Sequence, residues 1–93
     1  LLQRFQLNSE KNMSFWYMVC PKCYGQGRLV LTVDETKNIP FLNCDECEAS
    51  WYSVLSIQSE PPFLGYKIKN HIASLSEIEK FGWHKLALHE YKK

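Results

Sequence analysis

Two Cys-x-x-Cys motifs separated by twenty residues constrain the fold of this chain more than any other feature. The first is Cys20-Pro21-Lys22-Cys23 and the second is Cys44-Asp45-Glu46-Cys47, and together they contain all four cysteines of the chain. Two cysteines on one tight turn can point their sulfur atoms the same way, which favours a shared metal ion over disulfide bonds. Four thiolates suit tetrahedral Zn²⁺, so we predict a structural zinc site formed by Cys20, Cys23, Cys44 and Cys47.

The same four cysteines allow three other interpretations. Two disulfides in a small secreted protein are disfavoured because we recognise no signal peptide in the sequence. A redox-active Cys-x-x-Cys is disfavoured because no thioredoxin-like βαβ pattern surrounds either motif. An iron site of the rubredoxin type uses similar motifs, so the sequence leaves zinc and iron open.

The length and charge of the chain limit the class of function. Ninety-three residues suffice for one domain, and so small a core benefits from a metal cross-link. The formal net charge is +1, and a zinc ion with four thiolates would bring it to about −1, unlike the strongly basic balance of typical nucleic-acid-binding domains. No apolar run reaches membrane-spanning length. We expect a cytoplasmic protein, because cysteines that bind a metal instead of forming disulfides are typical of a reducing compartment.

The first residues of the chain differ from the rest. Met13-Ser14 would make a plausible native start, so we interpret residues 1–12 as a vector-derived or upstream extension. Residues 13–93 would then form a single zinc-ribbon domain with a C-terminal helical segment.

The pattern after Met13 predicts an α+β fold, with a zinc ribbon in a small antiparallel sheet of three or four strands and a short C-terminal helix. Strands are expected at 15–19, 28–33, 39–43 and 51–57, with a possible short edge strand at 66–69. Gly25 and Gly27 are expected to supply positive φ angles beside the metal. The helix signal is a capping box from Ser74 to Glu77, with a second register offered by Ser76 to Glu79, and Gly82 is expected to end the helix. The segment 83–91 fits either a helix or a strand, and we expect Trp83 to fold back onto the ribbon.

The polar residues outside the cysteines indicate binding more than catalysis. Four cysteines close the coordination shell of zinc, whereas catalytic zinc keeps an open position, so we do not expect an enzyme. His71, His84 and His89 occur in no recognisable catalytic motif and suit surface or packing roles. Asp45, Glu46 and Glu48 form an acidic cluster around the second motif. It is either a solvated turn or a docking patch for a basic protein partner.

Three stretches resemble known families. The span from Cys20 to Trp51 resembles a zinc ribbon. The stretch from Cys20 to Gly27 resembles the C-x-x-C-x-G-x-G unit of DnaJ-type chaperone zinc domains, although the second motif has no glycines. The ribbon with its acidic second motif, followed by the Ser-Leu-Ser-Glu-Ile-Glu-Lys-Phe-Gly-Trp segment at 74–83, resembles small bacterial zinc-ribbon immunity proteins of polymorphic or contact-dependent toxin systems.

The third resemblance implies a protein that binds one toxin domain in the cytosol and blocks it. We therefore expect a non-catalytic protein-binding module with structural Zn²⁺, acting as an immunity protein by occlusion. A nucleic-acid-binding ribbon of the transcription or translation machinery is the first alternative, supported by Lys22, Arg28, Lys67 and Lys69 together with many aromatic rings. A chaperone-like scaffold module is the second.

Overall fold

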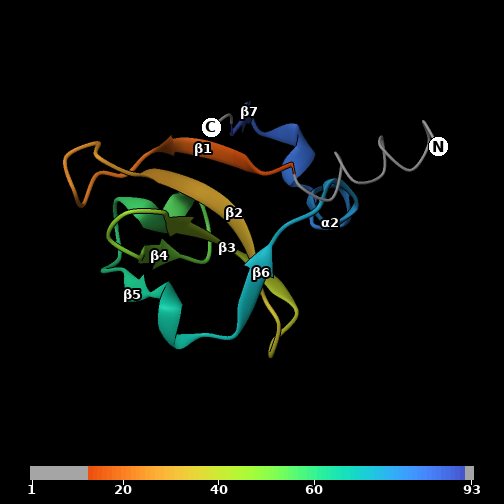
Figure 1. Ribbon diagram of the computed structural model, residues 1–93, viewed down its shortest axis with the longest axis horizontal. Coiled ribbons are helices and arrows are strands. Elements are labelled where there is room, and N and C mark those ends of the chain that lie inside the picture. The colour runs from red at the N-terminus through yellow and green to blue at the C-terminus, as the bar shows by residue number, and fades with distance from the viewer. Residues whose placement is uncertain (1–12, 92–93) are drawn as a thin grey trace.

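The computed structural model describes residues 13–91, so the extension predicted at residues 1–12 lies outside the described residues. The described part forms one antiparallel sheet and the short helix α2 (Leu75–Lys80), as Figure 1 shows. Its strands are β1 (Phe15–Val19), β2 (Arg28–Asp34), β3 (Ile39–Cys44), β4 (Ala49–Trp51), β5 (Phe63–Leu64), β6 (Asn70–Ile72) and β7 (His89–Glu90). A small antiparallel sheet with a short helix was predicted correctly, but seven strands replace the expected three or four.

The hairpin of β2 and β3 forms the centre of the sheet. The strands run in the order β5-β4-β3-β2-β1-β7, and β6 pairs with the end of β2 that β1 leaves uncovered. The register places Leu31 opposite Leu42 and Asp34 opposite Ile39. β2 is buried at every position after Arg28, since it pairs on both sides, and the polar residues 35–38 close the turn to β3.

The hydrophobic core lies on the face of the sheet that carries Leu31 and Leu42. Ile78 from α2 is 3% exposed and packs into this core. Trp83 is partly buried against the same cluster, so the segment after the helix folds back on the ribbon as expected. The buried residues of the cluster are Cys20, Leu29, Leu31, Val33, Leu42, Cys44, Ala49, Trp51, Ile57, Ala73 and Ile78.

The prediction of a long strand at 51–57 is wrong. Only Ala49–Trp51 pairs in the sheet, and the chain then bends into a 3₁₀ turn, η1 (Leu55–Ile57). The hydroxyls of Ser53 and Ser56 explain the break: each accepts a backbone N–H from the other residue, and the Ser56 hydroxyl donates to the Ser53 carbonyl. Serine side chains thus offer local partners to backbone groups that would otherwise join a ladder.

The prediction of a short edge strand at 66–69 is also wrong. A 3₁₀ turn, η2 (Gly65–Lys67), occupies this stretch, with β5 before it and β6 after it. Gly65 explains the placement, since its N–H donates to the Glu48 carbonyl and a Cβ there would lie 2.2 Å from Asn43 Nδ2. This close approach leaves no room for a side chain, and the chain turns around it.

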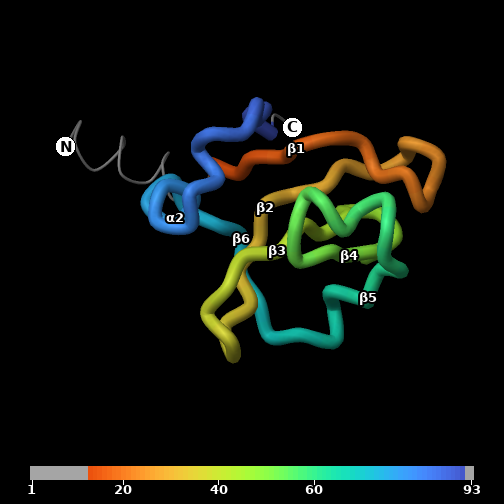
Figure 2. Tube along the Cα trace, turned by 180° about the vertical axis from the view of Figure 1, so that it is seen from behind, coloured from red at the N-terminus to blue at the C-terminus, as the bar shows by residue number. Residues whose placement is uncertain are grey.

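The helix begins and ends as predicted. The Ser74 hydroxyl accepts the Glu77 N–H, the Glu77 carboxylate accepts the Ser74 N–H, and Gly82 follows the helix with φ of 77°. The ambiguous segment after it forms a 3₁₀ turn, η3 (Trp83–Lys85), and then β7 beside β1. Figure 2 shows α2 at the opposite end of the sheet from the loops that carry the cysteines. No helix within residues 13–91 has the length and apolar character to cross a membrane.

Candidate metal centre

The topology of the sheet brings the two Cys-x-x-Cys motifs together. The first motif lies in the loop between β1 and β2, and the second lies in the loop between β3 and β4. Because β2 pairs with both β1 and β3, the two loops emerge at the same end of the sheet. Val19 lies opposite Arg28 and Leu29 lies opposite Cys44, so each motif starts where a ladder ends.

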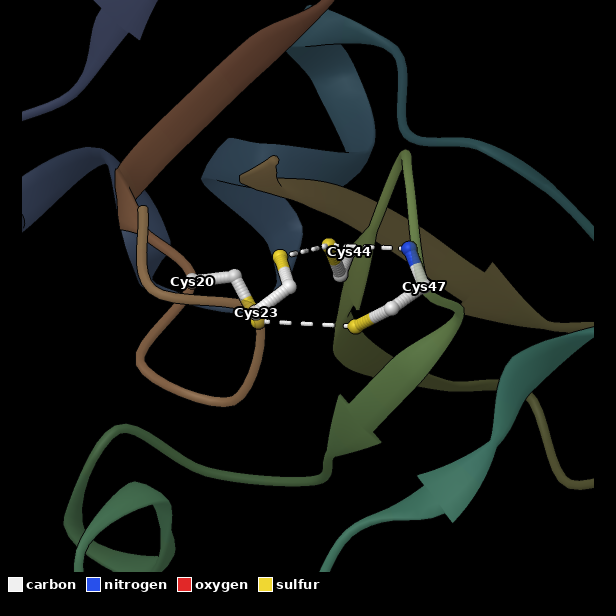
Figure 3. Close-up of side chains that lie close together, drawn as sticks. All are labelled: Cys20, Cys23, Cys44 and Cys47. Atoms are coloured by element: carbon white, nitrogen blue, oxygen red, sulfur yellow. Dashed lines mark hydrogen bonds between the residues drawn. The ribbon is translucent and has the colours of Figure 1, made fainter. Parts of the chain in front are cut away.

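The four predicted cysteines lie close together, as Figure 3 shows. Their Sγ atoms all lie within 4.8 Å of one another. The Sγ atoms of Cys20 and Cys47 are 3.7 Å apart, and so are those of Cys23 and Cys44. A tetrahedron with Zn–S bonds of about 2.3 Å has S–S edges of about 3.8 Å, whereas a disulfide requires about 2.05 Å. All four cysteines are free, and their spacing fits one tetrahedral ion.

Backbone N–H groups surround the sulfur atoms. The amide of Lys22 donates to Cys20 Sγ at 3.3 Å, and that of Gly27 donates to Cys23 Sγ at 3.3 Å. In the second motif the amides of Glu46 and Cys47 both donate to Cys44 Sγ at 3.4 Å. Such bonds would offset the −2 charge of a zinc ion bound by four thiolates.

The backbone of both motifs uses the left-handed region at the same place. The residue directly after the second cysteine has a positive φ in each motif, 58° at Tyr24 and 66° at Glu48. Gly25 follows with φ of 81°, which confirms one of the two glycine predictions. Gly27 does not have a positive φ and serves another purpose. A Cβ there would lie 2.4 Å from Cys44 Sγ, so only glycine lets the two loops approach.

Burial of the sulfur atoms bears on what the site can hold. Burial raises the pKa of the Cys20 and Cys44 thiols above the ordinary value. At Cys23 burial acts in the same direction, but the N–H of Gly27 and the neighbouring thiols outweigh it and lower the pKa. Buried thiols become thiolates most readily when a cation supplies the opposing charge. The donor set and its spacing therefore fit a metal ion, and four sulfurs in a tetrahedron suit zinc or iron.

The acidic cluster around the second motif is partly engaged within the domain. Asp45 Oδ1 accepts the Arg28 N–H at 2.9 Å, and Asp45 Oδ2 accepts the hydroxyl of Tyr91. Glu48 Oε1 accepts the side-chain amide of Asn43 at 3.2 Å. Glu46 is exposed, with its Cβ close to Gly27 of the first loop. The three carboxylates thus share one end of the sheet, and Asp45 and Glu48 also hold the second loop in place.

The three histidines lie on three different elements, and none belongs to the cysteine cluster. His89 stacks on Trp16 with ring centroids 4.4 Å apart, and His84 is exposed on η3. His71 on β6 contacts two carboxylates, those of Glu35 and Glu77. The sequence did not predict this last arrangement, because only the folded sheet brings the turn after β2 beside the start of α2.

A second arrangement that the sequence did not predict surrounds Arg28. Its guanidinium lies 5.0 Å from the ring centre of Trp16 and 5.1 Å from that of Tyr91.

Comparison with protein-family models, with curated proteins and with solved structures finds no match for this chain.

Proposed function

We propose that the four cysteines bind a structural Zn²⁺ and that the domain works by binding another protein, without catalysis. The observation that carries the structural role is the spacing of the four sulfur atoms, all within 4.8 Å and contacted by amides of both loops. A shell of four cysteines leaves no coordination position for a substrate or water. The metal then stabilises the end of the sheet from which both loops project.

The surface near the metal supports a protein partner. Tyr24 directly follows the first Cys-x-x-Cys motif and is 94% exposed. Glu46 lies in the adjacent loop and is also exposed. An exposed aromatic ring and an exposed negative side chain on these two loops suit a protein-binding surface, in which an aromatic anchor inserts and charges orient the partner.

We further propose that the partner is a toxin domain and that this protein is its cytoplasmic immunity protein. The acidic loop would cover a basic groove, such as the active site of a nuclease, by shape and charge complementarity. The resemblance of the ribbon and helix segments to bacterial immunity proteins supports this partner. A nucleic-acid partner is less favoured, because the formal net charge is only +1 and the acidic residues beside the cysteines would repel phosphates.

The test is neutralisation of a candidate toxin. The product of the gene next to this one would be expressed with and without the protein in bacterial cells, and its activity would be measured with purified components. Restored growth, together with stoichiometric inhibition that persists as salt rises from about 50 to about 500 mM, supports the proposal. Failure to inhibit, or tight oligonucleotide binding that falls steeply with salt, would overturn it.

A matched pair of charge reversals tests the surface. Glu46→Lys changes the loop beside the metal, and Glu79→Lys makes the same change on α2, at the far end of the sheet. We expect Glu46→Lys to weaken toxin binding about tenfold or more while both variants keep their zinc content. Equal affinities in the two variants would rule out the acidic loop as the docking patch.

A further inference from the structure

His71 lies between two carboxylates that come from different parts of the fold. Its Nδ1 atom is 2.9 Å from Glu35 Oε2, in the turn after β2, and its Nε2 atom is 2.8 Å from Glu77 Oε2, on α2. His71 itself belongs to β6. One imidazole ring therefore connects three elements at the end of the sheet opposite the cysteines, where Figure 1 shows β6 leading into α2.

The chemistry of imidazole makes this arrangement depend on protonation. A neutral ring has one N–H, so one of its nitrogens would direct a lone pair at a carboxylate oxygen. An imidazolium ring has two N–H groups and can donate to both carboxylates at once. The hydrogen bonds to Glu77 and Glu35 accordingly raise the pKa of His71 above its ordinary value, against the opposing effect of burial.

The other charged groups around the ring leave this conclusion unchanged. Lys69 Nζ lies 3.9 Å from Glu35 Oε1, but the lysine side chain is 82% exposed, so water screens its charge. The carboxylate of Asp34, next to Glu35, accepts the amides of Thr36 and Lys37. The pKa of Glu77 is itself lowered. Burial raises that pKa, but the Ser74 amide and His71 outweigh it.

We propose that His71 is a pH-sensitive clasp that fastens β6 and the start of α2 to the β2–β3 turn when it is protonated. Glu77 transmits the effect, because its Oε2 atom contacts His71 while its Oε1 atom accepts the Ser74 N–H of the capping box. Loss of the proton loosens this end of the domain and leaves the four-cysteine end unchanged. The segment that loosens includes Ala73 and Ile78, which are 2% and 3% exposed in the structure.

The direction of the pH effect follows from the raised pKa. The stabilisation is complete below the unfolded pKa of about 6.5 and is lost as the pH rises through the higher pKa of the folded state. Each unit of difference between the folded and unfolded pKa values of His71 corresponds to about a tenfold change in the equilibrium between the fastened and the loosened segment.

Hydrogen exchange and NMR titration of the zinc-loaded protein test the proposal. Protection of the Ile78 and Phe81 amides, corrected for intrinsic rates, should fall as His71 loses its proton, while protection of the Gly25 and Glu48 amides at the cysteine end stays constant. His71 should titrate above about 6.5. Titration at or below that value, or a parallel loss of protection at both ends, would overturn the clasp.

Conservative variants separate the clasp from ordinary packing. Glu77→Gln keeps an acceptor for the Ser74 amide but removes the negative charge, and Glu35→Gln removes the other charge. Each of these two variants should lower the pKa of His71 and reduce the pH dependence of amide protection in α2. The control variant His84→Asn should leave the His71 pKa and this pH dependence unchanged. An unchanged His71 titration in the two glutamine variants would contradict the proposal.

Discussion

Gly27 packs so closely against Cys44 that a Cβ at position 27 would lie 2.4 Å from the Cys44 Sγ atom. Gly27 closes the first cysteine loop, and Cys44 opens the second. The same Cβ would also lie 2.9 Å from the Cβ of Glu46. The absent side chain at this position therefore sets how closely the two halves of the metal centre approach.

Replacing this glycine should damage the metal centre. In Gly27→Ala the new methyl group must displace Cys44 Sγ or push the loops apart, which disturbs the tetrahedron. We expect zinc affinity to fall by about tenfold to a hundredfold, the range typical when groups that orient the ligands are changed. Competition with a chromophoric chelator measures the affinity.

Gly25→Ala is the control for that experiment. Its Cβ would meet Val19 at 3.9 Å, an ordinary contact, but φ of 81° strains an alanine. The expected result is a loss of about 1–2 kcal/mol in stability from the backbone, with a smaller change in zinc affinity. If Gly25→Ala weakened zinc binding more than Gly27→Ala, the close contact would not be the cause.

Removing one sulfur should unfold the domain or release its metal. Cys44 is 0% exposed and accepts two backbone amides, so Cys44→Ser leaves an incomplete shell within the core. We expect loss of stoichiometric zinc, measured by elemental analysis, and a lower melting temperature. A variant with full zinc content and an unchanged melting temperature would show that the four cysteines are not a structural site. The same analysis of the unaltered protein distinguishes zinc from iron.

The buried carboxylate of Asp34 should make the β2–β3 turn sensitive to acid. Asp34 is 2% exposed and accepts the amides of Thr36 and Lys37 and the hydroxyl of Tyr52. Burial alone would raise its pKa, but these hydrogen bonds outweigh burial and lower it. The stabilisation is therefore present above the unfolded pKa of about 3.9 and is lost as the pH falls through the lower folded value.

Substitution of Asp34 measures this contribution. Asp34→Ala should lower the free energy of unfolding by about 1–3 kcal/mol at neutral pH, because the amides of the turn and the Tyr52 hydroxyl lose their charged acceptor. Asp34→Asn keeps an acceptor of the same shape and should lose less. Urea unfolding at several pH values checks both, and stability of Asp34→Ala equal to that of the unaltered protein at neutral pH would contradict this role.

The hydroxyl of Tyr91 should help to hold the second cysteine loop. It donates to Asp45 Oδ2, and this hydrogen bond is the main reason that the pKa of Tyr91 is raised. Tyr91→Phe keeps the ring beside Arg28 and removes only the hydroxyl. We expect a loss of up to about 1 kcal/mol in unfolding free energy. Tyr66→Phe, at a position that is 64% exposed, should change stability little; equal effects would argue against the contact with Asp45.

Local patterns predicted much of this domain. The strands at 15–19, 28–33 and 39–43 alternate apolar residues or carry aromatic and β-branched ones, and the structure contains each of them with bounds extended by at most one residue. The capping box of Ser74 and Glu77 placed the helix, because its two hydrogen bonds span three residues. Misassignment began at Trp51, where apolar residues suggested a strand while the hydroxyls of Ser53 and Ser56 stabilised a turn.

The sequence by itself determined which residues can bind the metal, because two Cys-x-x-Cys motifs contain all the thiols of the chain and each motif is a local turn. Only the tertiary structure decided how the short strands pair, since β6 joins β2 and β7 joins β1 across long separations in sequence. Contacts such as His71 with Glu35 depend on these pairings, and two-residue or three-residue strands have no periodicity from which a partner can be predicted.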